Sequence, residues 1–166
     1  MQEPQSADAL LPVFQWLEQM WIGEAIRQSK WLFPAIEALH LVALVVIAAA
    51  VLVVDMRLFG VGLRDQRVSR LAEDVQPWFV WSLAVMLATG VLLFLSESIK
   101  CYYSFPFWVK MSCLALAIIF TLTIRKKVVF ADEHHVSPAW SKVVAVVSVT
   151  LWAGVGWGGR WIGFSG

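Results

Sequence analysis

The chain has 166 residues, the size of one domain, and its composition excludes the usual soluble classes. Hydrophobic residues make up 60% of it and charged residues 15%, whereas a soluble domain carries about a quarter of its residues as charge. The net charge of +1 offers no basic surface to a nucleic acid. The two cysteines are too few for a disulfide framework and form no CxxC motif. With a mean hydropathy of +0.72, the chain is predicted to be an integral membrane protein.

Residues 8–28 differ from the rest of the chain, because apolar residues recur there at helical spacing among polar ones. The apolar positions are Leu10, Val13, Phe14, Leu17 and Trp21. This pattern predicts an amphipathic helix that lies in the outer membrane interface before the chain enters the bilayer. The segment lacks the basic and apolar regions of a signal peptide, so we expect it to be retained.

Four charge-poor stretches follow, and each can cross a hydrocarbon core of about 30 Å at about 1.5 Å per helical residue. We predict transmembrane helices at 31–55, 78–96, 106–124 and 140–157. A shorter amphipathic stretch with Val68, Leu71 and Val75 is expected to lie along the inner surface. The predicted fold class is an all-α integral membrane protein, a single domain in which a four-helix transmembrane bundle follows an N-terminal amphipathic interfacial helix.

The orientation follows from the basic residues. Eight of the 13 lysines and arginines fall in, or just after, the loops that follow the first and third spans: Arg57, Arg64, Arg67, Arg70, Arg125, Lys126, Lys127 and Lys142. Because basic loops remain in the cytoplasm, we expect both termini outside and a multi-pass protein of the bacterial inner membrane. Tryptophans near the span ends fit interfacial belts, with Trp31, Trp108 and Trp157 on the outer side and Trp78, Trp81 and Trp140 on the inner side.

A histidine inside the first span is the leading candidate for a functional residue, because ionisable groups are costly in lipid. His40 lies nine residues after Trp31, roughly 13 Å deeper along a helix. Glu37 precedes it by one turn on the same helix face. We expect Glu37 to accept a proton from one imidazole nitrogen, which leaves the other as a ligand or an acid–base group. The alternative is a structural histidine, bonded to a carbonyl of a neighbouring helix.

Two further charged residues lie at the same level of the membrane. Glu97 ends the second span and Lys110 opens the third. Under one topology these residues, Glu37 and His40 all fall in the outer half, where we predict that they line one outward-opening polar pocket. The alternative is that Glu97 and Lys110 extend to the membrane interface, as charged residues near helix ends commonly do.

Other polar residues give weaker signals. Asp55 and Arg57 close the first span and are expected to form an interfacial pair that orients the helix. His134 and His135 lie in a polar loop, where adjacent residues point in different directions and no HxxxH or cysteine partner is present, so no metal site is predicted there. No nucleotide-binding loop, hydrolase triad or HExxH motif is present.

Several short motifs occur in a characteristic order between residues 31 and 125. They are Glu37-x-x-His40, Asp55-Met56-Arg57-Leu58-Phe59-Gly60, Pro77, Gly90 and Phe107-x-x-Lys110. In this order and spacing the chain resembles a superfamily of small bacterial four-helix membrane proteins. It contains HemJ-type protoporphyrinogen oxidases, CopD-like copper-resistance proteins and several families of unknown function, and the chain is most similar to one of the last group.

The resemblance implies a cofactor. HemJ-type enzymes are associated with b-type haem, so by resemblance His40 is expected to be an axial ligand or a catalytic residue. Lys110 is expected to be its partner or a contact of a haem propionate. One intramembrane histidine suffices for one b-type haem, whose second axial position another group can fill, and argues against a two-haem cytochrome.

Three functions are consistent with these patterns. The first is a redox protein that binds one b-type haem in the pocket, with Glu37 tuning His40, and passes electrons between the membrane and an external partner. The second is a copper or small-molecule transport module, in which His40 with Met86 or Met111 binds the copper. The third is a non-catalytic subunit that anchors or assembles a larger membrane complex. In each case the expected partners are the lipid bilayer and either further copies of the chain or other subunits.

Overall fold

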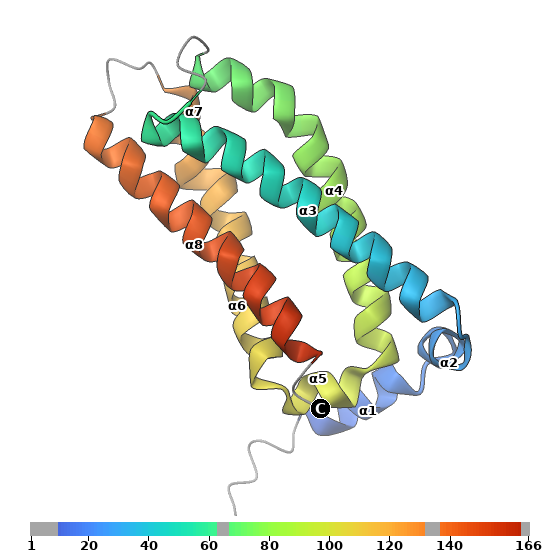
Figure 1. The fold of residues 1–166 in the computed structure, drawn as a ribbon. Helices are drawn as coiled ribbons and strands as arrows, with labels where there is room; N and C mark the ends of the chain where they lie inside the picture. The colour runs from blue at the N-terminus through green and yellow to red at the C-terminus, as the bar shows by residue number, and fades with distance from the viewer. Residues whose placement is uncertain (1–9, 63–66, 132–136, 164–166) are drawn as a thin grey trace, which may run out of the picture.

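The computed structural model describes residues 10–62, 67–131 and 137–163, and the regular structure of these residues is entirely helical. Arg64, His134 and His135 lie outside the described residues. Four helical segments are long and apolar enough to cross a membrane: α3 (Leu32–Phe59), α4 (Val68–Ser96), the continuous helix Phe105–Phe130 and α8 (Pro138–Ile162). The structure therefore confirms the predicted all-α membrane bundle of four helices (Figure 1).

The second span begins earlier than predicted. Val68, Leu71 and Val75 belong to the first turns of α4 and do not form a separate surface segment. Leu71 and Ala72 are buried in an apolar cluster with residues of the other three spans: Val54, Leu58, Val129 and Ala145. The charged residues of these turns face outward. The helix can therefore continue without interruption through residues that the sequence assigned to a separate segment on the inner surface.

The third span contains a local irregularity. It consists of α6 (Phe105–Phe120), a π-helical turn η1 (Thr121–Arg125) and α7 (Lys126–Phe130). A π-helical turn inserts one residue into an α-helix and changes which side chains face inward. Here the turn ends at Arg125, whose side chain is buried, although the sequence predicted a position in a cytoplasmic loop.

Three short helices lie across one end of the bundle, which we call the capped end; the other is the α7 end (Figure 1). They are α1 (Leu11–Glu18), α2 (Trp21–Gln28) and α5 (Ser98–Tyr103). The predicted single interfacial helix is thus two helices, because the backbone at Met20 is extended, with ψ at 137°. The break allows both helices to face the bundle: Phe14 packs edge-on against Phe94 at 5.5 Å, and Ile26 is buried.

The four spans pack mainly as two pairs, α3 with α4 and α6 with α8. Small residues allow close contact in the second pair, as is common for helices in membranes. A Cβ atom at Gly158 would lie 3.0 Å from Cβ of Lys110 and 3.1 Å from the backbone oxygen of Pro106. Midway along the bundle the pairs join in the central cluster, whose buried members are Ala43, Ile47, Val51, Met86, Leu114, Ala117, Trp152 and Val155.

Candidate functional site

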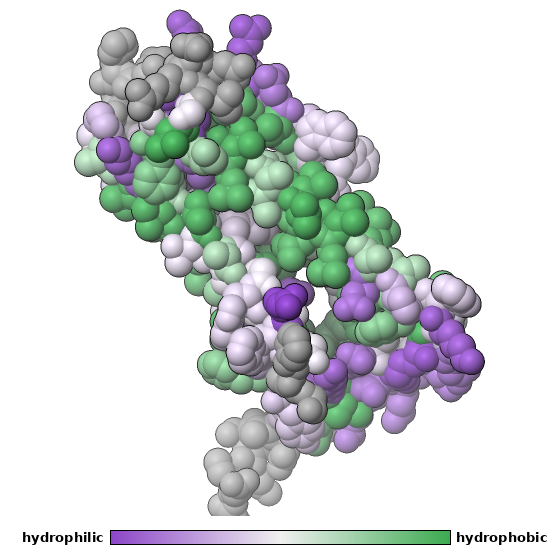
Figure 2. Space-filling view, in the orientation of Figure 1, coloured by the Kyte–Doolittle hydropathy of each residue, from purple (hydrophilic) through white to green (hydrophobic). Residues whose placement is uncertain are grey.

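A cavity of about 580 Å³ lies between the two helix pairs, towards the capped end. It is lined by Phe33, Glu37, His40, Leu41 and Leu44 of α3, by Gly90, Leu93, Phe94 and Glu97 of the α4 end, by Lys100 and Cys101 of α5, by Phe107 and Lys110 of α6, and by Gly156, Gly159, Arg160, Ile162 and Gly163 of α8. Figure 2 shows a hollow between α3 and α8 that is bordered by hydrophilic residues. The structure thus brings all four predicted site residues, Glu37, His40, Glu97 and Lys110, to one cavity. Its volume is typical of sites for small molecules and cofactors.

Glycines leave the space that the cavity occupies. A Cβ atom at Gly156 would meet nothing within 4 Å, so a side chain there would project into open space. A Cβ atom at Gly90 would lie 3.3 Å from Cε1 of His40, so the imidazole lies directly against the backbone of α4. At Gly159 the nearest atom is Nζ of Lys110, at 3.5 Å. Larger residues at these positions would narrow the cavity or displace its polar groups.

The protonation of His40 follows from its hydrogen bonds. Its Nδ1 lies 2.9 Å from Oγ1 of Thr89, and the Thr89 hydroxyl donates to the backbone carbonyl of Val85 at 2.7 Å. A hydroxyl has one proton to donate, and that of Thr89 is donated to the Val85 carbonyl. The Thr89 oxygen therefore accepts a hydrogen bond from Nδ1–H of His40. The second ring nitrogen, Nε2, is then unprotonated. His40 is buried, at 8% exposure, and lines the cavity, and Nε2 has no side-chain hydrogen-bond partner among the described residues.

Thr89 takes the place that the sequence assigned to Glu37. Glu37 lines the cavity, but no hydrogen bond or ion pair joins it to His40 or to any other residue in the described ranges. The contact between His40 and Thr89 joins α3 to α4 across 49 positions of the sequence. The spacing of residues within one helix therefore could not predict this contact. The only signal in the sequence was a lone threonine within an apolar span.

The remaining charges of the cavity differ in their pairing. Glu97 and Lys100 form an ion pair at 3.8 Å, close to the capped end. Lys110 is partly buried and lines the cavity, and the described part of the chain supplies it with no ion pair or hydrogen bond. Glu37 and Lys110 therefore remain as two opposite charges, each without a protein counter-ion among the described residues.

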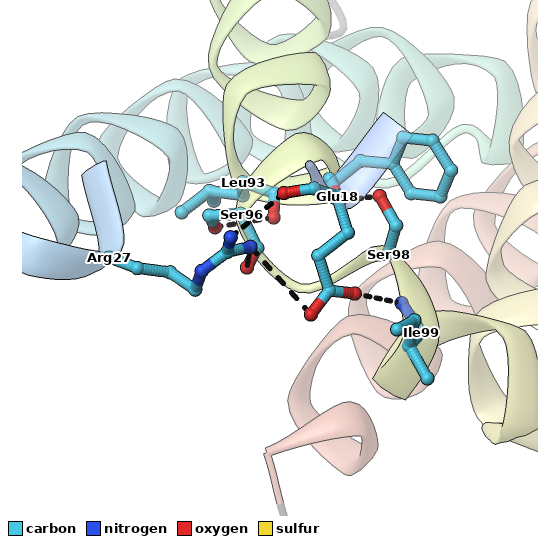
Figure 3. Close-up of polar contacts among 7 residues, drawn as sticks. Glu18, Arg27, Leu93, Ser96, Ser98 and Ile99 are labelled. Carbon is cyan, nitrogen blue, oxygen red and sulfur yellow. Dashed lines mark hydrogen bonds and ion pairs between the residues drawn. The ribbon is translucent and has the colours of Figure 1, made fainter. Parts of the chain in front are cut away.

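The short helices of the capped end hold one wall of the cavity in place (Figure 3). A carboxylate oxygen of Glu18 accepts from the backbone N–H of Ile99 at 2.6 Å, at the start of α5. Arg27 donates to the backbone oxygens of Ser96 and Glu18, both at 2.8 Å. These contacts fix the turn between α4 and α5, which carries three residues that line the cavity: Glu97, Lys100 and Cys101.

Cys101 is a poor candidate for a ligand or nucleophile. Burial, with a smaller contribution from the neighbouring Glu97 carboxylate, raises the pKa of its thiol to about 11. Only the thiolate binds metals well or attacks electrophiles, so this thiol is inert near neutral pH. Cys101 instead contributes an apolar surface beside the charged rim.

The described residues hold no group of three His, Cys, Asp or Glu side chains that could bind a bare metal ion. The methionines considered as copper ligands are not among the residues that line the cavity. Met86 is buried in the central cluster, Met111 is 44% exposed, and neither lines the cavity. A cofactor that supplies most of its own metal ligands fits this site better than a free ion.

The predicted interfacial pair of Asp55 and Arg57 needs correction. Asp55 is completely buried, and its carboxylate accepts a 2.9 Å hydrogen bond from Nε of Arg125, the residue that η1 turns inward. Nη2 of Arg125 also donates to the backbone oxygen of Val51. The ion pair therefore joins α3 to the third span inside the bundle, near the α7 end.

Comparison with known proteins gives a family but no described relative. No curated protein and no solved structure matches the chain. The match is to a protein-family model described as a family of unknown function, DUF6644, and it extends over residues 13–165. It includes α3, α4, α6 and α8, and so every helix that lines the cavity. The chain belongs to the DUF6644 family.

Proposed function

We propose that this chain is a membrane redox protein that binds one b-type haem in the cavity, with Nε2 of His40 as an axial ligand. The observation that carries the proposal is the hydrogen-bonded chain from His40 through Thr89 to the backbone of Val85. Thr89 and Val85 hold the proton on Nδ1, so the nitrogen that a metal would bind is unprotonated. A hydrogen bond to the second ring nitrogen also orients the imidazole and raises its basicity as a ligand.

The lining of the cavity fits a haem. A porphyrin supplies four of the nitrogens that iron needs, so a site with one imidazole can suffice. Leu41, Leu44 and Leu93 provide apolar surface for a macrocycle. Lys110, which has no counter-ion in the described ranges, provides a positive charge for a propionate carboxylate.

The protein residues then have separate tasks. His40 binds and Thr89 orients it, while Lys110 attracts the acidic edge of the cofactor. Towards the α7 end the cavity is followed by the apolar residues of the central cluster. When bound, haem would supply one-electron redox chemistry at a potential set by its ligands and by burial.

An absorption spectrum tests this proposal. The protein is produced in cells supplied with haem, purified in detergent and measured before and after addition of dithionite. We expect a Soret band that shifts on reduction. Wild-type protein that is folded and has no Soret absorbance would overturn the haem assignment.

Thr89 provides a finer test of the ligand geometry. Thr89→Val removes the hydroxyl and keeps the shape, so the tautomer of His40 is no longer fixed. We expect haem affinity to fall about 10–100-fold, the usual effect of losing a partner of a ligating histidine. Thr89→Ser keeps the hydroxyl and is the matched control, with affinity close to that of the wild type. Equal affinities in Thr89→Val and the wild type would show that this hydrogen bond has no role in binding.

The orientation is also part of the proposal. We place the capped end outside the bacterial inner membrane, because basic residues such as Arg67, Lys126 and Lys127 gather at the α7 end. An impermeant thiol reagent on intact cells should then label Lys30→Cys and not Ser69→Cys, in a chain without its native cysteines. The reverse pattern would invert the topology.

A further inference from the structure

The cavity is bounded at both ends along the bundle and is open on the side that Figure 2 shows. Towards the α7 end it stops at the central cluster. At the capped end it meets α5, whose residues Lys100 and Cys101 form part of the lining. Between α3 and α8 the surface is hollowed, and Figure 2 shows this opening from the side of the bundle. An opening on the side of a transmembrane bundle faces lipid.

The helices that border the opening carry residues suited to such an entrance. Leu41 of α3 lines the cavity and is also 52% exposed, so it belongs to both the cavity and the outer surface. It lies nine residues after the first residue of α3, about 14 Å along the helix, which is the level of the acyl chains. One turn further, Val45 is 67% exposed. On the opposite border Gly156 has no side chain to close the gap.

Polarity changes across the cavity in the direction expected for an amphiphile. The deepest cavity-lining residue of α3 is the apolar Leu44, twelve residues after the first residue of that helix. The part nearer the capped end carries the charged groups, among them Lys110, which no carboxylate of the described chain neutralises. A cation that is partly buried in a membrane is stabilised when an acidic group comes to it.

We infer that the cavity opens sideways into the membrane and takes up amphiphiles with an acidic head group from the leaflet next to the capped end. The apolar part of the molecule would pass between Leu41 and Gly156, and the acid would meet Lys110. This inference rests on the same cavity as the proposed function, but it requires neither iron nor His40. Haem with its propionates would be one member of this class.

A photoactivatable fatty acid with a diazirine on its chain tests the inference. The full chain is reconstituted in phosphatidylcholine vesicles that contain this probe, irradiated and digested, and the labelled residues are mapped by mass spectrometry. We expect label on cavity residues such as Leu44 and Leu93, in the haem-free wild type and in His40→Ala. A fatty alcohol with the same diazirine should label these positions less, and Lys110→Gln should abolish that difference. Label confined to outward-facing residues such as Val45 would overturn the inference.

Two matched variants test the entrance itself. Gly156→Phe fills the open space beside α8, so label inside the cavity should be lost while label on the outer surface remains. Ala153→Phe adds the same side chain at an exposed position of the same helix and should leave both unchanged. Cavity labelling that persists in Gly156→Phe would show that the probe does not enter here. The labelling of His40→Ala does not depend on haem. A missing Soret band would therefore contradict the haem proposal alone, and missing cavity label would contradict the lateral entry of amphiphiles.

Discussion

The two halves of the bundle both bury ionisable groups, and they treat them in opposite ways. Near the α7 end, Asp55 and Arg125 meet at 2.9 Å within packed side chains. Near the capped end, the buried His40, the partly buried Lys110 and the exposed Glu37 line a cavity of about 580 Å³, and no described residue forms an ion pair with Lys110 or Glu37. In the first arrangement the two charges neutralise each other within the chain, although Oδ2 of Asp55 has no hydrogen-bond partner among the described residues. The second arrangement has charged groups still available for a ligand.

This difference separates structural from functional ionisable residues better than burial alone. An ionisable residue inside a membrane segment is a functional candidate by default. If burial were the criterion, Asp55 would rank above His40, because Asp55 is completely buried. Its pairing with Arg125 shows that it joins two spans. His40 is held by Thr89 at Nδ1, and its second nitrogen has no side-chain partner among the described residues.

The largest effect is expected from breaking the ion pair between Asp55 and Arg125. Arg125→Ala leaves Asp55 as a buried charge without a partner, which should lower the free energy of unfolding by about 3–5 kcal/mol. The free energy of unfolding is measured by denaturation in mixed micelles that is monitored by circular dichroism. The double variant Asp55→Leu/Arg125→Met removes both charges and should recover most of the loss. If Arg125→Ala unfolded like the wild type, the ion pair would not join the spans.

Substitution of the α8 glycines should change the free energy of unfolding according to whether the glycine faces a packed helix or the cavity. Gly158→Ala places a methyl group about 3 Å from Lys110 and Pro106, so we expect a loss of about 1–3 kcal/mol from overpacking. Gly156→Ala is the matched control two residues away, where the methyl group meets only the cavity. It should be neutral or slightly stabilising, because alanine favours a helix. Equal losses in both variants would contradict the difference in packing.

Much of this fold could be predicted from the sequence, because apolar runs in a membrane determine helices directly. The four spans and the grouping of Glu37, His40, Glu97 and Lys110 depend only on position along helices. The partners of these residues depend on helix rotation and on contacts between distant segments. Thr89 and Arg125 were missed for this reason, and the π-helical turn that directs Arg125 inward has no sequence signature that we recognise.

A smaller effect is expected at the capped end. Glu18→Ala removes the carboxylate that accepts from Ile99, and because this site is partly exposed we expect a loss of about 1 kcal/mol. Hydrogen exchange should show it locally, as faster exchange of the α5 amides. Glu24→Ala is the control, since the Glu24 side chain accepts a hydrogen bond from the exposed Gln28 and from no other residue that the structure describes. Unchanged exchange in Glu18→Ala would show that the short helices do not hold the α5 wall.

The smallest effect concerns the reactivity of Cys101. Its thiol has a pKa raised to about 11, so the thiolate is scarcer near neutral pH than for an ordinary cysteine. We expect slow alkylation in the folded protein that accelerates as the pH rises well past about 8.5, the usual thiol pKa. Chain unfolded in denaturant, which removes the burial, is the control. A rate that levels off near the usual pKa would contradict this environment.

The comparison between the halves is tested most directly by one spectrum, recorded for His40→Ala and Arg125→Ala side by side, each with its unfolding curve. We predict that His40→Ala loses the Soret band and unfolds like haem-free wild type. The folded fraction of Arg125→Ala should keep the band although its stability is reduced. An unchanged Soret band in His40→Ala would contradict the account, because the open half of the bundle would then not hold the cofactor through this residue.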